Sequence, residues 1–290
     1  MKRITKTIIR RLFGAKQNEN FLDCCQRKKY HFLKRINRKN FSVDELKRAL
    51  IEMGLKKNDI VVVHSAWRSF VGFDGRPEDV IDVISNIVGE GGTILMPSYG
   101  KDRKKLQYSE PTTAGVLAEI FRKKYASERS LSSYFSMSAS GKKSKRLTES
   151  HLDSLYYFDE KSPYWKAMED GGKILLLGLG KHPYKISLFH CVAYNLKGTM
   201  PEYANIYSDS VKTFLVDRNG KKFTKTIINK GDRIKNNNKI FKRLFREIIK
   251  PEEHRRINYL DIYLFDSKDL FNRAQGKIVE DNINIYRIIK

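Results

Sequence analysis

The chain has 290 residues, 40% of them hydrophobic, and carries 57 lysines and arginines against 33 aspartates and glutamates, a formal net charge of +24 at pH 7. This length and hydrophobic content predict a folded protein with a sizeable core, and they exclude a disordered chain. No apolar run approaches the ~20 residues that span a bilayer. The N-terminus does not read as a signal peptide, and three cysteines do not make a disulfide framework. We therefore expect a cytoplasmic protein with reduced thiols.

The positive charge is concentrated in two blocks. Residues 1–40 hold 13 basic and 2 acidic residues, a balance of +11, and residues 221–250 hold 11 and 2, a balance of +9. Such blocks favour anionic partners, namely nucleic acid, acidic lipid or nucleotide-bearing small molecules, although a solvated basic surface has the same composition. RNA-binding aromatic signatures are missing, so we do not expect nucleic acid as the partner.

Residues 1–41 are interpreted as a basic N-terminal extension and residues 42–290 as one α/β domain. Within the extension, Ile4, Ile8 and Leu12 recur at helical spacing among lysines and arginines. This pattern is typical of a helix on an anionic membrane surface, and equally of a helix that packs on the domain through its apolar stripe. The first alternative predicts peripheral contact with the inner face of the membrane. Neighbouring cysteines, Cys24 and Cys25, are expected to be free thiols.

The domain begins with a helix that Ser42 and Glu45 open as a capping box and that ends at Gly54. Apolar strands over 59–65, 93–98 and 172–180 then alternate with helices over 76–92 and 113–125. Continuous apolar strands alternating with helices predict an α/β fold with a mainly parallel sheet covered by helices on both faces. Later, 211–228 reads as a hairpin around Asn219 and Gly220, a dipeptide that type I′ turns prefer. Residues 236–250 read as an amphipathic helix.

Polar residues follow the ends of the apolar strands, which is where open α/β sheets bind ligands. The first strand leads into "HSAWRS" (His64–Ser69), the second ends in "PS" (Pro97, Ser98), and "SLFHCVAY" follows the third, with His190 at its centre. Hydroxyls and a guanidinium suit a phosphate-bearing cofactor. No HExxH, zinc-like cysteine pairs, GxxxxGK[ST] or GxSxG occurs, so no metal site is expected.

Five motifs in order resemble the aminoglycoside 3-N-acetyltransferase family, which is unrelated to the GNAT fold. They lie within residues 43–205: "MGLKKNDIVVVHSAWRSFVG", "GTILMPS", "RSLSSYFSMSASG", "FDEKSP" and "GKILLLGLGKHPYKISLFHCVA". Four positions depart from the family pattern. Ser132 and Ser133 stand where His-Pro is usual, Asp159 replaces a glycine, and Ala193 replaces a glutamate three residues after His190.

The resemblance implies an acyl-CoA-dependent N-acyltransferase that uses acetyl-CoA or another short-chain acyl-CoA as co-substrate and no metal. His190 matches the catalytic histidine, which takes a proton from the attacking amine, and Ser187 matches the threonine three residues before it. With Ala193 in place of the orienting glutamate, Glu160 or Glu202 supplies the carboxylate, or the histidine works alone. The remaining matches imply a pocket for pantetheine and phosphates lined by His64, Ser65, Arg68, Ser69, Pro97 and Ser98.

The acceptor is expected to be an amino sugar rather than a drug. A strongly basic protein repels a cationic aminoglycoside and attracts a nucleotide-linked or lipid-linked amino sugar, which favours a role in surface-polysaccharide synthesis. Two alternatives stay open. One is an antibiotic-resistance enzyme that acts on aminoglycosides. The other is a weakly active or inactive homologue whose basic arms bind an anionic membrane or nucleic acid.

Overall fold

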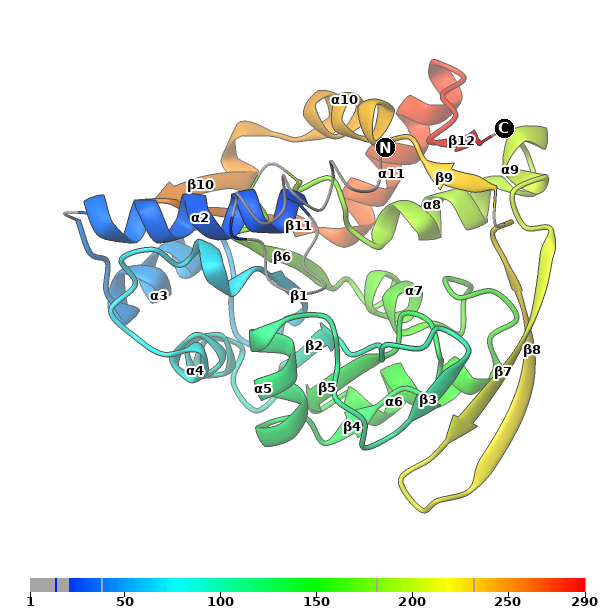
Figure 1. Ribbon diagram of the computed structural model, residues 1–290, viewed down its shortest axis with the longest axis horizontal. Coiled ribbons are helices and arrows are strands. Elements are labelled where there is room, and N and C mark those ends of the chain that lie inside the picture. Colours follow the sequence, from blue (N-terminus) through cyan, green and yellow to red (C-terminus); the bar gives the residue numbers. More distant parts are fainter. Residues whose placement is uncertain (1–13, 15–20, 38, 181, 232, 290) are drawn as a thin grey trace.

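A computed structural model describes residues 14, 21–37, 39–180, 182–231 and 233–289. Its centre is a seven-stranded sheet in the order β10-β11-β6-β1-β2-β5-β4 (Figure 1). The strands are β1 (Ile60–Ser65), β2 (Thr93–Pro97), β4 (Glu128–Arg129), β5 (Met137–Gly141), β6 (Lys173–Leu177), β10 (His254–Ile257) and β11 (Leu260–Asp266). The pairings give five of these seven strands one direction, with β5 and β11 opposed. The predicted mainly parallel α/β sheet is confirmed.

The central strands are buried on both faces, as their uninterrupted apolar sequences predict. Successive side chains point to opposite faces, so Val61 and Val63 belong to one hydrophobic core and Ile60 and Val62 to the other. Each fully buried aliphatic side chain of this kind contributes about 1.5–3 kcal/mol relative to an exposed one. The two cores fix the register of the strands, because a shift of a strand by one residue would move each of its side chains into the opposite core.

Helices cover both faces of the sheet (Figure 1). One core is closed by α3 (Val43–Glu52), α4 (Pro77–Val88) and α5 (Val116–Lys124). The other is closed by α6 (Ser144–Thr148), α7 (Pro163–Glu169), α8 (Leu188–Leu196), α10 (Asn238–Ile248) and α11 (Ser267–Glu280). The capping box of Ser42 and Glu45 is present at α3, and Gly89 ends α4 at φ 63°, both as the sequence predicts.

A long hairpin of β7 (Asp209–Val216) and β8 (Lys222–Asn229) extends away from the sheet, with β3 (Lys105–Gln107) at its edge (Figure 1). The hairpin is confirmed, but its turn is not type I′. Only Gly220 has a positive φ (80°), whereas a type I′ turn needs positive φ at Asn219 as well. The Asp217 carboxylate accepts hydrogen bonds from two loop amides and holds a longer loop instead.

The remaining elements border the sheet. They are η1 (Trp67–Ser69), η2 (Glu149–Asp153), α9 (Pro201–Ala204), η3 (Pro251–Glu253) and a small sheet of β9 (Ile234–Asn236) with β12 (Tyr286–Ile288). No helix among the described residues is long and apolar enough to cross a membrane.

The described part of the N-terminal extension is α2 (Phe21–Ile36), which lies against η1. Tyr30 places its hydroxyl 2.8 Å from the Oγ of Ser69, and Cys24 is buried. This half of the extension therefore packs on the domain. The amphipathic pattern of residues 1–13 lies outside the described residues.

Candidate active site

A cavity of about 420 Å³ lies at the ends of β1 and β2, beside the first turn of α8. Segments far apart in the sequence meet there. Its described lining is His64, Pro97, Tyr99, Phe135, Tyr164, Tyr184, Lys185, Ile186, Ser187, His190, Lys235, Asn236, Asn238, Phe241 and Arg287. This is the strand-end location that the sequence pattern predicts.

His190 enters this cavity from α8. Its ring stacks on Phe158 with centroids 4.9 Å apart, and its Nδ1 lies 2.8 Å from the hydroxyl oxygen of Tyr286. That is the one hydrogen bond its ring makes among the described residues, and Nε2 is not a buried unsatisfied atom. The Nε2 atom is therefore free for a molecule in the cavity.

Burial keeps both histidines of the cavity neutral. Desolvation, with a smaller contribution from the positive charge of Lys230, lowers the pKa of His190 to about 3. Desolvation alone lowers the pKa of His64 to about 4. A neutral imidazole has a lone pair with which it can accept a proton, so near pH 7 the ring of His190 is in the charge state that a general base requires.

Ser187 and Tyr164 complete the inner wall. Ser187 immediately precedes α8, and its carbonyl oxygen accepts the backbone N–H of His190 at 2.9 Å. The buried hydroxyl of Tyr164 lies close to Ser187 without a hydrogen bond of ordinary geometry. Its ring also stacks on His64, with centroids 6.1 Å apart. Two imidazoles, Ser187 and the Tyr164 ring thus line one small space.

The charged groups among the described lining residues of the cavity are all cations. Lys185, Lys235 and Arg287 are exposed side chains that line it. No aspartate or glutamate occurs among its described lining residues. The cavity therefore presents positive charge to whatever enters it, which favours an anionic ligand.

The residues expected to bind the cofactor divide into two groups. His64 and Pro97 line the cavity. Ser65, Ser69 and Ser98 are not among its lining residues: Ser65 ends β1, and the other two are buried. Ser69 donates to the Gly178 carbonyl at 2.5 Å, and Ser98 Oγ accepts from Ser138 at 2.8 Å. The structure gives these two hydroxyls a packing role, because both are already engaged inside the protein.

Arg68 lies in a different hollow of about 380 Å³, which it lines together with Lys34 and Trp67. Its side chain is exposed and does not line the cavity of His190. It can serve a ligand only if that ligand extends over α2 and η1, as a long cofactor would.

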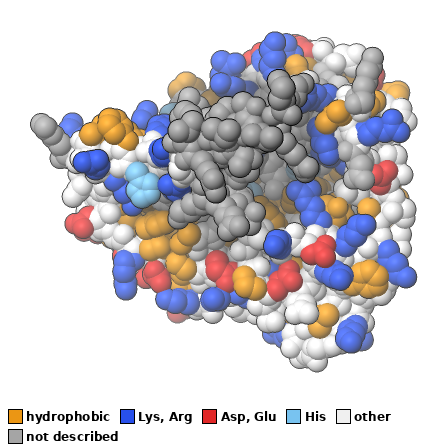
Figure 2. Space-filling view, in the orientation of Figure 1, with side chains coloured by type: hydrophobic (Ala, Val, Ile, Leu, Met, Phe, Trp, Pro, Cys, Tyr) orange, Lys and Arg blue, Asp and Glu red, His pale blue; other side chains and the backbone are white. Residues whose placement is uncertain are grey.

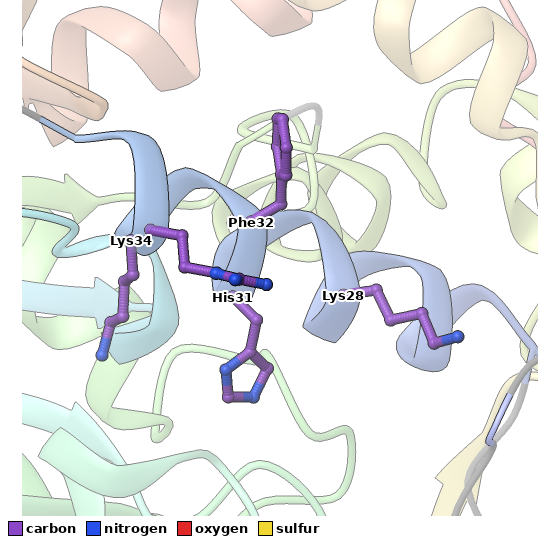
Figure 3. A pocket seen from close by; sticks show the side chains of 5 residues that line it. Lys28, His31, Phe32 and Lys34 are labelled. Atoms are coloured by element: carbon purple, nitrogen blue, oxygen red, sulfur yellow. The ribbon is translucent and has the colours of Figure 1, made fainter.

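A further hollow of about 480 Å³ borders α2 and is lined by Lys28, His31, Phe32, Lys34 and Arg35 among the described residues. Its labelled side chains diverge from the helix: Phe32 and His31 point to opposite sides, and Lys28 and Lys34 lie toward opposite ends (Figure 3). Basic side chains are spread over the visible part of this face and are not gathered into one patch (Figure 2). This arrangement does not form a convergent binding site.

Neither candidate carboxylate touches His190. Glu160 is exposed and accepts a hydrogen bond from Tyr194 at 2.9 Å, and Glu202 is exposed on α9. Neither of them is among the described residues of the cavity. Ala193 is fully buried in the hydrophobic core. Among the described residues no hydrogen bond joins Glu160 or Glu202 to His190, so the replacement of the family glutamate by either carboxylate stays a prediction that this geometry does not support.

Other motif residues stabilise the loops around the site. Arg129 is buried and donates to the backbone carbonyls of Ser98, Tyr108 and Glu110. Buried Asp159 accepts from the hydroxyl of Ser154 and from three backbone amides. In this chain both residues are therefore engaged in holding the backbone of the loops around the site.

The sequence did not indicate the residues from the C-terminal segment. Tyr286, Arg287 and Lys235 come from β12 and β9, far along the chain from the recognised motifs. Their only sequence signal was the positive charge of the block 221–250, which carries Lys235.

Comparisons with known proteins agree with this fold. Residues 62–278 match the family model described as aminoglycoside 3-N-acetyltransferase. Aminoglycoside N(3)-acetyltransferase IV from Salmonella sp is 29% identical over 140 residues, 47% of this chain. That match spans 53%, about half, of the relative's own length.

Solved structures of the same enzyme class share the fold. AAC-VIa bound to sisomicin matches with a TM-score of 0.69 at 18% identity, over 84% of this chain and 99% of its own. AAC-IIIb in a binary complex with CoASH matches with a TM-score of 0.65 at 19% identity, over 84% and 98%. Because the family model covers most of the chain, including His64 and His190 at the cavity, the chain belongs to the aminoglycoside 3-N-acetyltransferase family.

Proposed function

We propose that the protein transfers an acetyl or other short acyl group from CoA to the amine of an anionic amino sugar, with His190 as general base. The observation that carries this proposal is a neutral histidine in a cavity whose described charged residues are all cations. The family supplies the reaction type, and a solved relative binds CoASH.

The reaction needs little more than positioning and a base. The amine nitrogen attacks the thioester carbonyl carbon, so that a C–N bond forms and the C–S bond breaks. His190 Nε2 accepts the proton that the attacking nitrogen loses, and that proton passes to the leaving thiolate to give CoASH. A well-placed base typically contributes about 10²–10⁴-fold to such a step. Ser187 lines the same cavity, where its hydroxyl can bind the acceptor.

The three cations suit the acceptor better than the phosphates of CoA. A sphere of 420 Å³ is about 9 Å across. An extended pantetheine arm holds the CoA phosphates well beyond that distance from the thioester. A phosphate on the anomeric carbon of a sugar, in contrast, lies within one ring's width of an amine on the same ring. We therefore expect Lys185, Lys235 and Arg287 to hold the diphosphate of a nucleotide-linked amino sugar.

The same cations oppose an aminoglycoside. Each like-charge contact at 4 Å costs about 1 kcal/mol in water and more in a partly enclosed site. AAC-VIa, one of the structural relatives, was solved with sisomicin. In this chain we expect that class of acceptor to be poor, and the role to be in surface-polysaccharide synthesis.

Acceptor choice is tested with the full chain and acetyl-CoA by measuring thiol release. The acceptors are a nucleoside diphosphate-linked amino sugar, the same sugar without the nucleotide, and gentamicin. We expect the nucleotide-linked sugar to give the highest kcat/KM. Gentamicin acetylated at about 10⁴ M⁻¹s⁻¹ or above would overturn the anionic acceptor and favour a resistance enzyme.

The role of the cavity cations is tested with one variant at the cavity and one control on the hairpin. Lys235→Gln removes one charge at the cavity and should raise KM for the nucleotide-linked sugar about 10-fold, the value of one charge-assisted hydrogen bond. Lys222→Gln removes an equal charge from the exposed hairpin and should leave KM unchanged. Equal effects of the two variants would mean that only the overall charge matters.

A second candidate is an inactive homologue that binds anionic membranes, which the basic residues along α2 favour. Acetyl-CoA separates the two candidates. A ligand of the native state must raise the melting temperature, so the enzyme predicts a rise. The absence of any rise, together with no calorimetric binding of short-chain acyl-CoA, would refute the proposed enzyme.

A further inference from the structure

His190 lacks a carboxylate partner, yet its Nδ1 is not left unpaired. The hydroxyl oxygen of Tyr286 lies 2.8 Å away, and the two rings stack with centroids 6.2 Å apart at 19°. Tyr286 is not among the residues that line the cavity, whereas His190 is. The tyrosine therefore stands behind the imidazole, on the side opposite to the substrate space.

The position of Tyr286 is fixed by its surroundings. The side chain is buried at 4% exposure. Its strand β12 pairs with β9, with Tyr286 opposite Asn236. The ring also contacts Phe241 of α10, and the ammonium group of Lys230 lies 5.0 Å from the ring centroid. A side chain held from several directions can hold its hydrogen-bond partner in one orientation.

We propose that Tyr286 is the positioning residue for His190, replacing the orienting carboxylate that this chain lacks at Ala193. Its hydroxyl oxygen accepts the Nδ1–H of the imidazole and so keeps the lone pair of Nε2 directed into the cavity. This rests on the proposed role of His190 as the base. Tyr286 lies beyond residues 62–278, the part of the chain that the family model matches.

The replacement has a chemical consequence. A carboxylate only accepts hydrogen bonds, so it fixes the Nδ1–H tautomer and stabilises the imidazolium with a full negative charge. A phenol oxygen accepts the same bond without that charge, and burial raises the pKa of Tyr286 well above its usual range, so the phenol stays neutral. We expect the contribution of Tyr286 to be smaller than the ~10⁴-fold of a triad aspartate.

The test is Tyr286→Phe, which keeps the ring and removes only the hydroxyl. We expect kcat to fall on the order of 10–10²-fold, with KM for acyl-CoA and for the acceptor unchanged. Tyr203→Phe is the matched control. Tyr203 is a buried tyrosine whose ring is 6.3 Å from that of Tyr286 and whose hydroxyl donates to the Ile283 carbonyl at 2.8 Å. The Tyr203→Phe variant should be less stable than the wild type and should keep the wild-type kcat. Equal losses of kcat in the two variants, or none in Tyr286→Phe, would overturn the proposal.

A second measurement does not depend on turnover. Nitrogen NMR of the labelled imidazole in the full chain should show the proton of His190 on Nδ1, with a shift toward Nε2–H in Tyr286→Phe. A wild-type ring protonated on Nε2 would overturn the assignment of Tyr286 as acceptor.

His190→Ala separates failure of this inference from failure of the proposed base. If that variant loses turnover while Tyr286→Phe keeps it, Tyr286 does not position the ring and the base stands. If His190→Ala retains full turnover, the proposed base fails and this inference fails with it.

Discussion

The hydroxyl of Ser69 donates a hydrogen bond to the carbonyl oxygen of Gly178 at 2.5 Å and thereby joins η1, which follows β1, to the residue that follows the parallel strand β6. A β-carbon added at Gly178 would meet the Ser69 side chain at 2.5 Å. The two residues are in contact, and the buried hydroxyl of Ser69 is already hydrogen-bonded inside the protein. Ser69 therefore supports the loops around the cavity and is not one of its described lining residues.

Ser69→Ala should lower the free energy of unfolding by about 1–2 kcal/mol, because the Gly178 carbonyl loses its buried donor. KM for acyl-CoA should not change. Urea denaturation and steady-state kinetics measure the two effects. Ser65→Ala, at the end of the same strand, is the control and should change stability by less than about 0.5 kcal/mol. A raised KM for acyl-CoA with unchanged stability would show instead that Ser69 binds the cofactor.

Arg129→Lys should be strongly destabilising, by about 3 kcal/mol or more, because an ammonium group cannot reproduce the planar fork that serves several carbonyls. Burial lowers the pKa of the Arg129 guanidinium to about 10, so its charge is retained and must be satisfied inside the protein. Arg218→Lys, where the arginine is exposed, is the comparison and should cost little. Similar melting temperatures for both variants would contradict the buried role.

Stability should fall as the pH falls below about 6.5. Burial lowers the folded-state pKa of His64 to about 4 and those of His151 and His190 to about 3. The unfolded chain binds protons near pH 6.5, so between pH 6.5 and pH 4 it holds more protons than the folded chain, and acid favours unfolding. Each histidine contributes up to about 1.4 kcal/mol per pH unit in this window. Urea titrations at several pH values measure the slope, and an unchanged stability down to pH 4.5 would contradict it.

Deleting residues 1–20 tests the membrane alternative. The deletion removes six basic residues and one acidic residue, a balance of +5. Each basic residue near an anionic surface contributes about 1 kcal/mol, so binding to phosphatidylserine vesicles should weaken at low salt and differ less at high salt. Co-sedimentation measures it. Equal sedimentation of the shortened and full chains would show that this segment does not attach the protein to lipid.

The sequence by itself determined the three adjacent parallel strands β1, β2 and β6, the helices α3, α4, α5 and α10, and the place of His190 just beyond β6. These features depend on local patterns: apolar runs for β1, β2 and β6, a capping box at Ser42, and a histidine just beyond a buried strand. Parallel strands then bring their carboxyl ends together, so the approximate location of the cavity followed from the same patterns.

Only the tertiary structure decided which polar residues face the cavity. His64 and Ser69 leave the same strand, but Ser69 turns toward Gly178 and is used in packing. Nothing in the sequence around His190 indicates Tyr286, which lies 96 residues further along the chain. Its position depends on the pairing of β12 with β9. Such contacts between distant segments form when a whole core packs, and no local pattern of residues encodes them.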